Sequence, residues 1–251
     1  AWIALNNVIA ASATSRVVGG EGSQTAWAVG LGLLATAVVA LAFSDRLVSA
    51  LGGPRFVLVV SFLGWAGASA KVSLFPLGGA VVAIGFVSAW RSCATQAARL
   101  RSIAAAAAPW IVLGAPLLLW SFAKTGSPFG PWLAGMFGPS LFSPDTFPEF
   151  AEATRIVNRT PLAAILFDNF AACSPLVWIG AVGALVSTTT PATVRHWGTV
   201  LLVGQCVLVL WLLPYHARFL GGLPYGLAIC FALYLPPRLS ATRGATAAAV
   251  A

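Results

Sequence analysis

Charged residues are scarce in this 251-residue chain. Asp, Glu, Lys and Arg make up 8% of it, whereas a soluble domain carries roughly 25%. Hydrophobic residues make up 59%, and the mean hydropathy is +0.90. This composition argues against a water-soluble enzyme, a nucleic-acid-binding domain and a disordered chain, and it indicates an integral membrane protein.

Residues that bind metals or form disulfides are also few. The two histidines, His196 and His216, are far apart in the sequence and have no acidic neighbour with which to form a site. The four cysteines share no short spacing, so neither a disulfide framework nor a thiolate metal site is indicated. We therefore expect no metal centre and no cofactor, and only assistance by a divalent cation stays open.

Acidic residues number 6 against 14 basic ones, which gives a net charge of +8 and a calculated pI near 10.2. The basic residues stand singly between apolar runs. That pattern is typical of positive-inside anchoring in a bilayer rather than of nucleic-acid binding. The expected partner is therefore the lipid bilayer, with no nucleic acid, and the sequence does not define an oligomeric state.

Runs free of charged residues define the expected architecture, an all-α polytopic transmembrane bundle. A crossing needs about 20 apolar residues, and we expect seven spans in a single transmembrane domain, residues 1–251. The apolar start, 1–13, is too short to cross and is read as the tail of a further helix, so the chain is expected to be a fragment. The expected spans are 26–43, 56–70, 75–90, 103–122, 162–186, 197–214 and 219–235.

The second and third spans are short, and Lys71 and Pro76 separate them. Together they are too long for one helix across a core of about 30 Å. We therefore predict two short crossings joined by a tight turn.

The stretch 123–161 is predicted to be a long extracytoplasmic loop at the membrane interface. Glycines and prolines are dense between 125 and 144, which breaks any regular helix. Thr146-Phe147-Pro148-Glu149 has the spacing of a capping box, so 147–157 is read as a short amphipathic helix on the membrane surface.

The distribution of charge also predicts which loops face the cytoplasm. If the arginine-rich loop 91–102 is cytoplasmic, alternation of the spans places eight basic residues and a single acid, Asp45, on that side. Almost all other acidic residues then face outward. We therefore expect any polar site to lie at the extracytoplasmic face of an inner (plasma) membrane.

Five polar residues on that face are candidates for a site. Lys71 and Arg218 are cations that could hold a phosphate or a carboxylate, and the alternative for each is an interfacial anchor. Glu21 precedes a helix, where the macrodipole alone favours an acid. Asp168 either bonds a neighbouring helix or lines a polar cavity, and His216 stands beside Arg218 in the sequence.

Short segments at these positions resemble a known family. Thr125-Gly126-Ser127-Pro128 follows a span and opens the long loop, Arg218-Phe219-Leu220 begins the last span, and Ala70-Lys71-Val72 precedes a short helix. They resemble motifs of the GT-C glycosyltransferases, integral membrane enzymes that use polyprenyl-phosphate sugars, such as protein O-mannosyltransferases and aminoarabinose transferases. Glu21 resembles an acidic position of that family. Gly221 and Gly222 depart from its motif.

The resemblance implies transfer of a sugar from a polyprenyl-phosphate donor to an acceptor at the extracytoplasmic face. Lys71 and Arg218 would bind the donor phosphate, and the catalytic base, absent from these segments, would be encoded upstream of Ala1. An apolar groove for the lipid tail would be lined by Phe129, Trp132, Phe137 and Phe142. A transporter or permease, and a membrane subunit without catalysis, are the alternative classes that the sequence leaves open.

Overall fold

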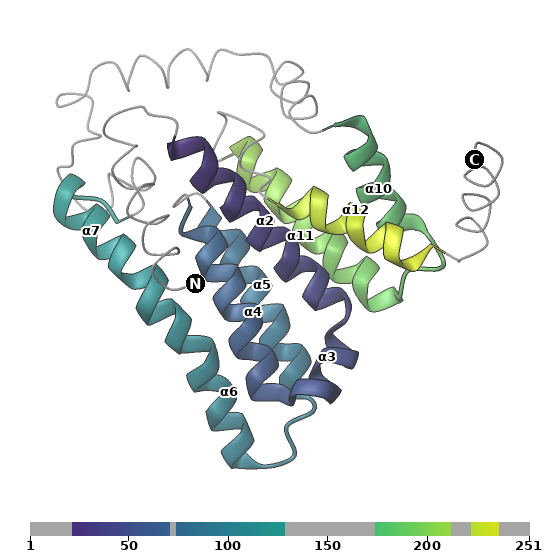
Figure 1. Ribbon diagram of the computed structural model, residues 1–251, viewed down its shortest axis with the longest axis horizontal. Coiled ribbons are helices and arrows are strands. Elements are labelled where there is room, and N and C mark those ends of the chain that lie inside the picture. The colour runs from purple at the N-terminus through teal and green to yellow at the C-terminus, as the bar shows by residue number, and fades with distance from the viewer. Residues whose placement is uncertain (1–21, 71–73, 129–173, 212–221, 236–251) are drawn as a thin grey trace, which may run out of the picture.

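The computed structural model describes residues 22–70, 74–128, 174–211 and 222–235 (Figure 1). All regular secondary structure in these ranges is helical, so the expected all-α class is confirmed there. The elements are α2 (Gly22–Ala42), α3 (Ser44–Leu51), α4 (Gly53–Ala68), α5 (Phe75–Trp90), α6 (Gln96–Pro109), the π-helical turn η2 (Trp110–Gly114), α7 (Ala115–Thr125), α10 (Pro175–Val186), α11 (Ala192–Trp211) and α12 (Leu223–Tyr234).

Helices α4 and α5 form an antiparallel hairpin, as the break at Lys71 and Pro76 predicts. A Cβ on Gly64 would lie 3.3 Å from the Gly78 carbonyl oxygen, and one on Gly85 would lie 2.9 Å from Val60. Glycines at the contact let two backbones approach closely, which is how helices pack when lipid removes the hydrophobic drive between them. The alternative of one tilted helix over 56–90 is therefore wrong.

Helix α2 packs between this hairpin and α12. Gly30 faces Gly67 and Ala70 near the end of α4, and a Cβ on Gly226 of α12 would lie 2.7 Å from Val38. Farther along, the Tyr234 hydroxyl donates to the Ala42 carbonyl oxygen over 2.7 Å. The order of these contacts shows that α2 runs antiparallel to α4 and parallel to α12.

The longest helix runs continuously from Gln96 to Thr125 and contains a π-helical turn. Pro109 and Pro116 flank this turn, and each lacks the N–H of a regular helical bond. Ser61 of α4 donates to the Ala106 carbonyl over 2.8 Å. Ser69, the residue after α4, donates to the Trp65 carbonyl over 2.7 Å and lies 3.3 Å from the Leu113 carbonyl oxygen. These side-chain bonds tie the proline-containing helix to α4.

Helix α3 is missing from the spans read from the sequence, which assigned its residues to a cytoplasmic loop. It is bent by 85° from α2 and has no fully buried residue. Leu47 and Val48 pack partly against the core, while Asp45 and Arg46 are exposed. The helix is therefore short and amphipathic, and it crosses the end of the bundle.

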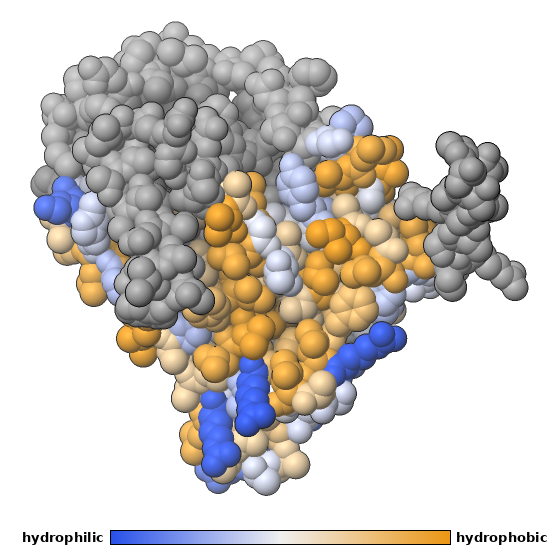
Figure 2. Space-filling view, viewed as in Figure 1, coloured by the Kyte–Doolittle hydropathy of each residue, from blue (hydrophilic) through white to orange (hydrophobic). Residues whose placement is uncertain are grey.

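The described helices carry an apolar exterior as well as an apolar core. Figure 2 shows hydrophobic side chains covering the flank of the molecule, and Ile111, Leu119 and Leu176 are 62%, 68% and 76% exposed. Within these residues one helix, Gln96–Thr125, is long and apolar enough to span a membrane, and α2 with α3 adds a second if that bent pair is one span. These features support association with a membrane.

Helix boundaries differ from the expected spans where charged residues lie inside a helix. The 103–122 span begins at Gln96, because Thr95 caps the helix by accepting a hydrogen bond from the Ala98 N–H over 3.2 Å. The 197–214 span begins at Ala192, directly after Pro191. The 162–186 span is described only from Pro175, and residues 1–21 and the amphipathic helix expected at 147–157 lie outside the described residues.

Candidate functional site

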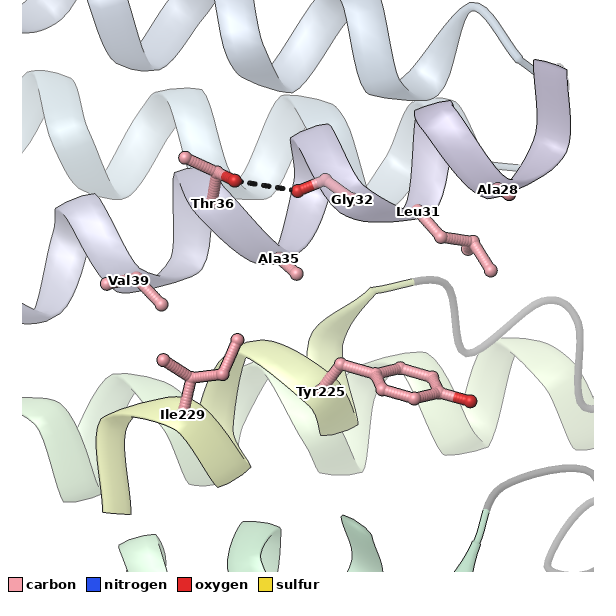
Figure 3. A pocket seen from close by; sticks show the side chains of 8 residues that line it. All are labelled: Ala28, Leu31, Gly32, Ala35, Thr36, Val39, Tyr225 and Ile229. Carbon is pink, nitrogen blue, oxygen red and sulfur yellow. Dashed lines mark hydrogen bonds between the residues drawn. The ribbon is translucent and has the colours of Figure 1, made fainter. Parts of the chain in front are cut away.

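An apolar groove runs between α2 and α12 (Figure 3). It is open to the outside and has a volume of about 630 Å³. Gly222 and Gly226 hold the start of α12 tightly against Leu31, Ala35 and Val38. The groove opens beside this contact, and its lining residues are Ala28, Leu31, Gly32, Ala35, Thr36, Val39, Tyr225 and Ile229.

The lining offers little to a charged ligand. The Thr36 hydroxyl donates its hydrogen to the Gly32 carbonyl oxygen of its own helix over 2.8 Å. Ile229 is 46% exposed, and Tyr225, 38% exposed, supplies a phenol in the first turn of α12. An apolar chain with a polar group at one end fits such a surface better than a polar solute does.

The helix ends gather on two opposite sides of the bundle. Helices α2, α5, α10 and α12 run toward one side, and α4, α6–α7 and α11 run back, as the glycine contacts and the α4–α6 hydrogen bonds show. The first side, here called the arginine end, carries Arg46, Arg55, Arg91, Arg99, Arg101 and Arg195. The opposite side, here called the lysine end, carries Lys124 as its single charged side chain within the described ranges.

This arrangement agrees with the sorting of charges expected from the sequence. Figure 2 shows strongly hydrophilic side chains at and near the narrow tip of the molecule. Asp45, the only carboxylate among the described residues, lies at the arginine end, as predicted. The geometry sorts the residues into two ends but does not assign an end to a side of a membrane.

The residues predicted to form the site lie outside the described residues, so the structure neither brings them together nor separates them. They are Glu21, Lys71, Phe129, Trp132, Phe137, Phe142, Asp168, His216 and Arg218. Their segments nevertheless start and finish at helix ends that are described. The described residues on either side of the segments 71–73, 129–173 and 212–221 lie at the lysine end, and α2, which follows Glu21 in the sequence, begins there.

Sequence reasoning missed the groove of α2 and α12. The signal that could have found it is Gly222-Leu223-Pro224-Tyr225-Gly226, in which glycines four residues apart mark a close helix contact. The adjacent positions Tyr225 and Ile229 have the same spacing and must then flank the contact.

Metal-binding groups are not assembled in the part of the chain that is described, where no three His, Cys, Asp or Glu side chains come together. Cys93 is buried, and its Sγ lies 3.5 Å from the Ser102 hydroxyl. His196 is exposed at the arginine end.

Comparisons with known protein families, with curated proteins and with solved structures found no match for this chain. The assignment of a fold and a function therefore rests on the sequence and the geometry described above.

Proposed function

We propose that this chain belongs to a multi-pass integral membrane protein of the inner (plasma) membrane that transfers a sugar from a polyprenyl-phosphate donor to an extracytoplasmic acceptor. One observation carries the proposal. All three internal segments that hold predicted site residues are attached to the bundle at the lysine end, on the side opposite the arginines. The described helix ends that flank these segments therefore share one end of the fold.

The groove of α2 and α12 supports a donor with a long apolar tail. It is apolar and open to the outside, so an apolar chain can lie in it. Tyr225 lies in the first turn of α12, near the lysine end, and α12 follows the Arg218-Phe219-Leu220 segment in the chain. A tail along the groove would direct a phosphate headgroup toward that end.

The proposed glycosyl transfer assigns its reacting groups to residues outside the described ranges. Sugar transfer leaves a lipid phosphate, whose developing charge cations such as Lys71 and Arg218 would stabilise. A carboxylate acting as general base would remove the proton from the acceptor hydroxyl. The role proposed for Lys71 and Arg218 is donor binding.

Short helices are compatible with several crossings. Helices α4 and α5 have 16 residues each, or about 24 Å at 1.5 Å per residue. That is a few ångströms less than a bilayer core, a mismatch that local thinning of the bilayer accommodates. Their exposed aliphatic residues, such as Leu58, Val59 and Val87, are suited to lipid.

The proposal is tested by binding of the donor lipid to the full-length protein in membranes. A photoactivatable undecaprenyl phosphate should label the protein, and unlabelled undecaprenyl phosphate should prevent the labelling at least tenfold better than neutral undecaprenol. Equal competition by the two lipids would show that the phosphate is not recognised, and it would contradict the proposed function.

The multi-pass orientation makes a separate prediction. Ser92 and Ala123 are both exposed. Ser92 lies just before the helix Gln96–Thr125, at the arginine end, and Ala123 lies in its last turn, at the lysine end. In a variant without its native cysteines, a cysteine at Ala123 should react with a membrane-impermeant maleimide added to intact cells, and one at Ser92 should react only after permeabilisation. The reverse result would overturn the orientation. Ser102 and Ser127 are unsuitable probes because both are 0% exposed.

A further inference from the structure

The arginine end combines high charge with few carboxylates. Six arginines lie there, and Asp45 is the only carboxylate among the residues that the structure describes, so five positive charges have no carboxylate to offset them. Arg46, Arg55, Arg91 and Arg101 are exposed. These side chains are available to an anionic partner.

Three of the arginines come from neighbouring elements. A Cβ on Gly53 would lie 3.0 Å from the Cys93 Sγ, which places the start of α4 beside the turn between α5 and α6. Arg55 lies in the first turn of α4, and Arg91 directly follows α5. Helix α3, which bears Arg46, packs on both α4 and α5.

Arg99 differs from these arginines because it supports the turn itself. Its Nε donates to the Cys93 carbonyl oxygen over 3.4 Å, and its guanidinium carbon lies 5.3 Å from the centre of the Trp90 ring. Arg99 thereby holds the turn between α5 and α6 in place.

Helix α3 gives this end the form of a membrane-surface element. It makes an angle of 85° with α2. If α2 crosses a bilayer, α3 therefore lies close to the plane of its surface. Leu47, Val48 and Leu51 share one face, and Asp45, Arg46 and Ser49 share the other. An amphipathic helix in this position suits the boundary between headgroups and acyl chains.

We propose that the arginine end is a binding surface for anionic phospholipid headgroups, with Arg46, Arg55 and Arg91 contacting lipid phosphates. Guanidinium groups match phosphate oxygens in a planar, bidentate geometry. The excess of arginine over carboxylate selects lipids with net negative charge over zwitterionic ones. The apolar face of α3 favours a lipid over an acidic soluble protein.

The test is competitive lipid retention by the full chain, purified in a neutral detergent with equal amounts of dioleoyl phosphatidylglycerol and dioleoyl phosphatidylcholine. Native mass spectrometry should show phosphatidylglycerol retained at least tenfold over phosphatidylcholine. A triple variant, Arg46→Gln, Arg55→Gln and Arg91→Gln, should lose most of this preference, because each arginine near an anionic surface contributes roughly fivefold in affinity.

A charge-preserving triple variant, with lysine at the same three positions, is the matched control and should keep most of the preference. Lys124→Gln at the lysine end should leave it unchanged. An unaltered preference in the glutamine variant, or equal retention of both lipids by the wild type, would overturn the proposal. If the glutamine variant does not fold, the test uses the wild type, whose preference for phosphatidylglycerol is compared at low salt and after exposure to 0.5 M NaCl. Salt should weaken a preference that depends on charge, and an unchanged preference would contradict the proposal.

Discussion

Replacing Gly30 by valine should strongly destabilise the helical bundle. A Cβ at this position would overlap the Ala70 Cβ and lie 3.0 Å from the Gly67 carbonyl oxygen. Neither atom belongs to a flexible side chain, so α2 and α4 would have to separate. Overpacking of a tight core costs about 1–3 kcal/mol and occasionally more. We expect a loss near 3 kcal/mol here, because the neighbouring atoms cannot move away.

Gly32→Val is the matched control for this prediction. Gly32 lies on the same helix, and a Cβ there meets nothing within 4 Å. The measurement is thermal unfolding in detergent, together with the monodisperse fraction on size exclusion. Gly32→Val should unfold within a few degrees of the wild type, whereas Gly30→Val should unfold far lower or aggregate. Similar unfolding of both variants would contradict the close packing of α2 on α4.

Arg218→Ala in the full-length protein should lower the turnover of a polyprenyl-phosphate sugar at least tenfold. Arg218 precedes α12 by a few residues and belongs to the segment that joins α11 and α12 at the lysine end. A hydrogen bond to a charged group is worth about 1.5–3 kcal/mol, or roughly tenfold to a hundredfold. Protein abundance and the unfolding temperature should stay normal, because the proposed role is contact with the donor.

Two further variants serve as controls for the effect of Arg218→Ala on turnover. Arg218→Lys should recover only part of the activity, since an ammonium lacks the planar fork of guanidinium. Lys124→Ala removes an exposed cation at the same end and should leave turnover close to the wild type. If Arg218→Ala transfers sugar normally, Arg218 is an interfacial anchor and the strongest link to glycosyl transfer is lost.

The helices of the described region could be predicted because apolar runs and helix breakers are local properties of the chain. Lys71 and Pro76 marked the break between α4 and α5, and runs without charge marked the helix centres. The ends were less predictable. Arg99 and Arg101 lie inside α6, since a helix can extend beyond the apolar region when a cap such as Thr95 satisfies its first N–H groups.

The candidate site was predicted only as a set of residues. Charge alternation placed Lys124 and the arginines at opposite ends, and the structure agrees, because each turn reverses the chain direction. The groove of α2 and α12 could not be foreseen. It depends on two helices whose lining residues, such as Leu31 and Tyr225, are far apart in the sequence and lie beside one groove only through the tertiary fold.

Composition and local pattern, then, determined the all-helical class, the positions of the helices and the division of charge between two ends. Three features needed the tertiary structure: the 85° bend before α3, the hydrogen bonds that Ser61 and Ser69 donate to carbonyls of α6 and of the π-helical turn, and the close pairing of Gly30 with α4. Each depends on contacts between elements that no local pattern specifies. A hydrophobic run fixes which residues avoid water, but it does not fix which small residues let two backbones touch.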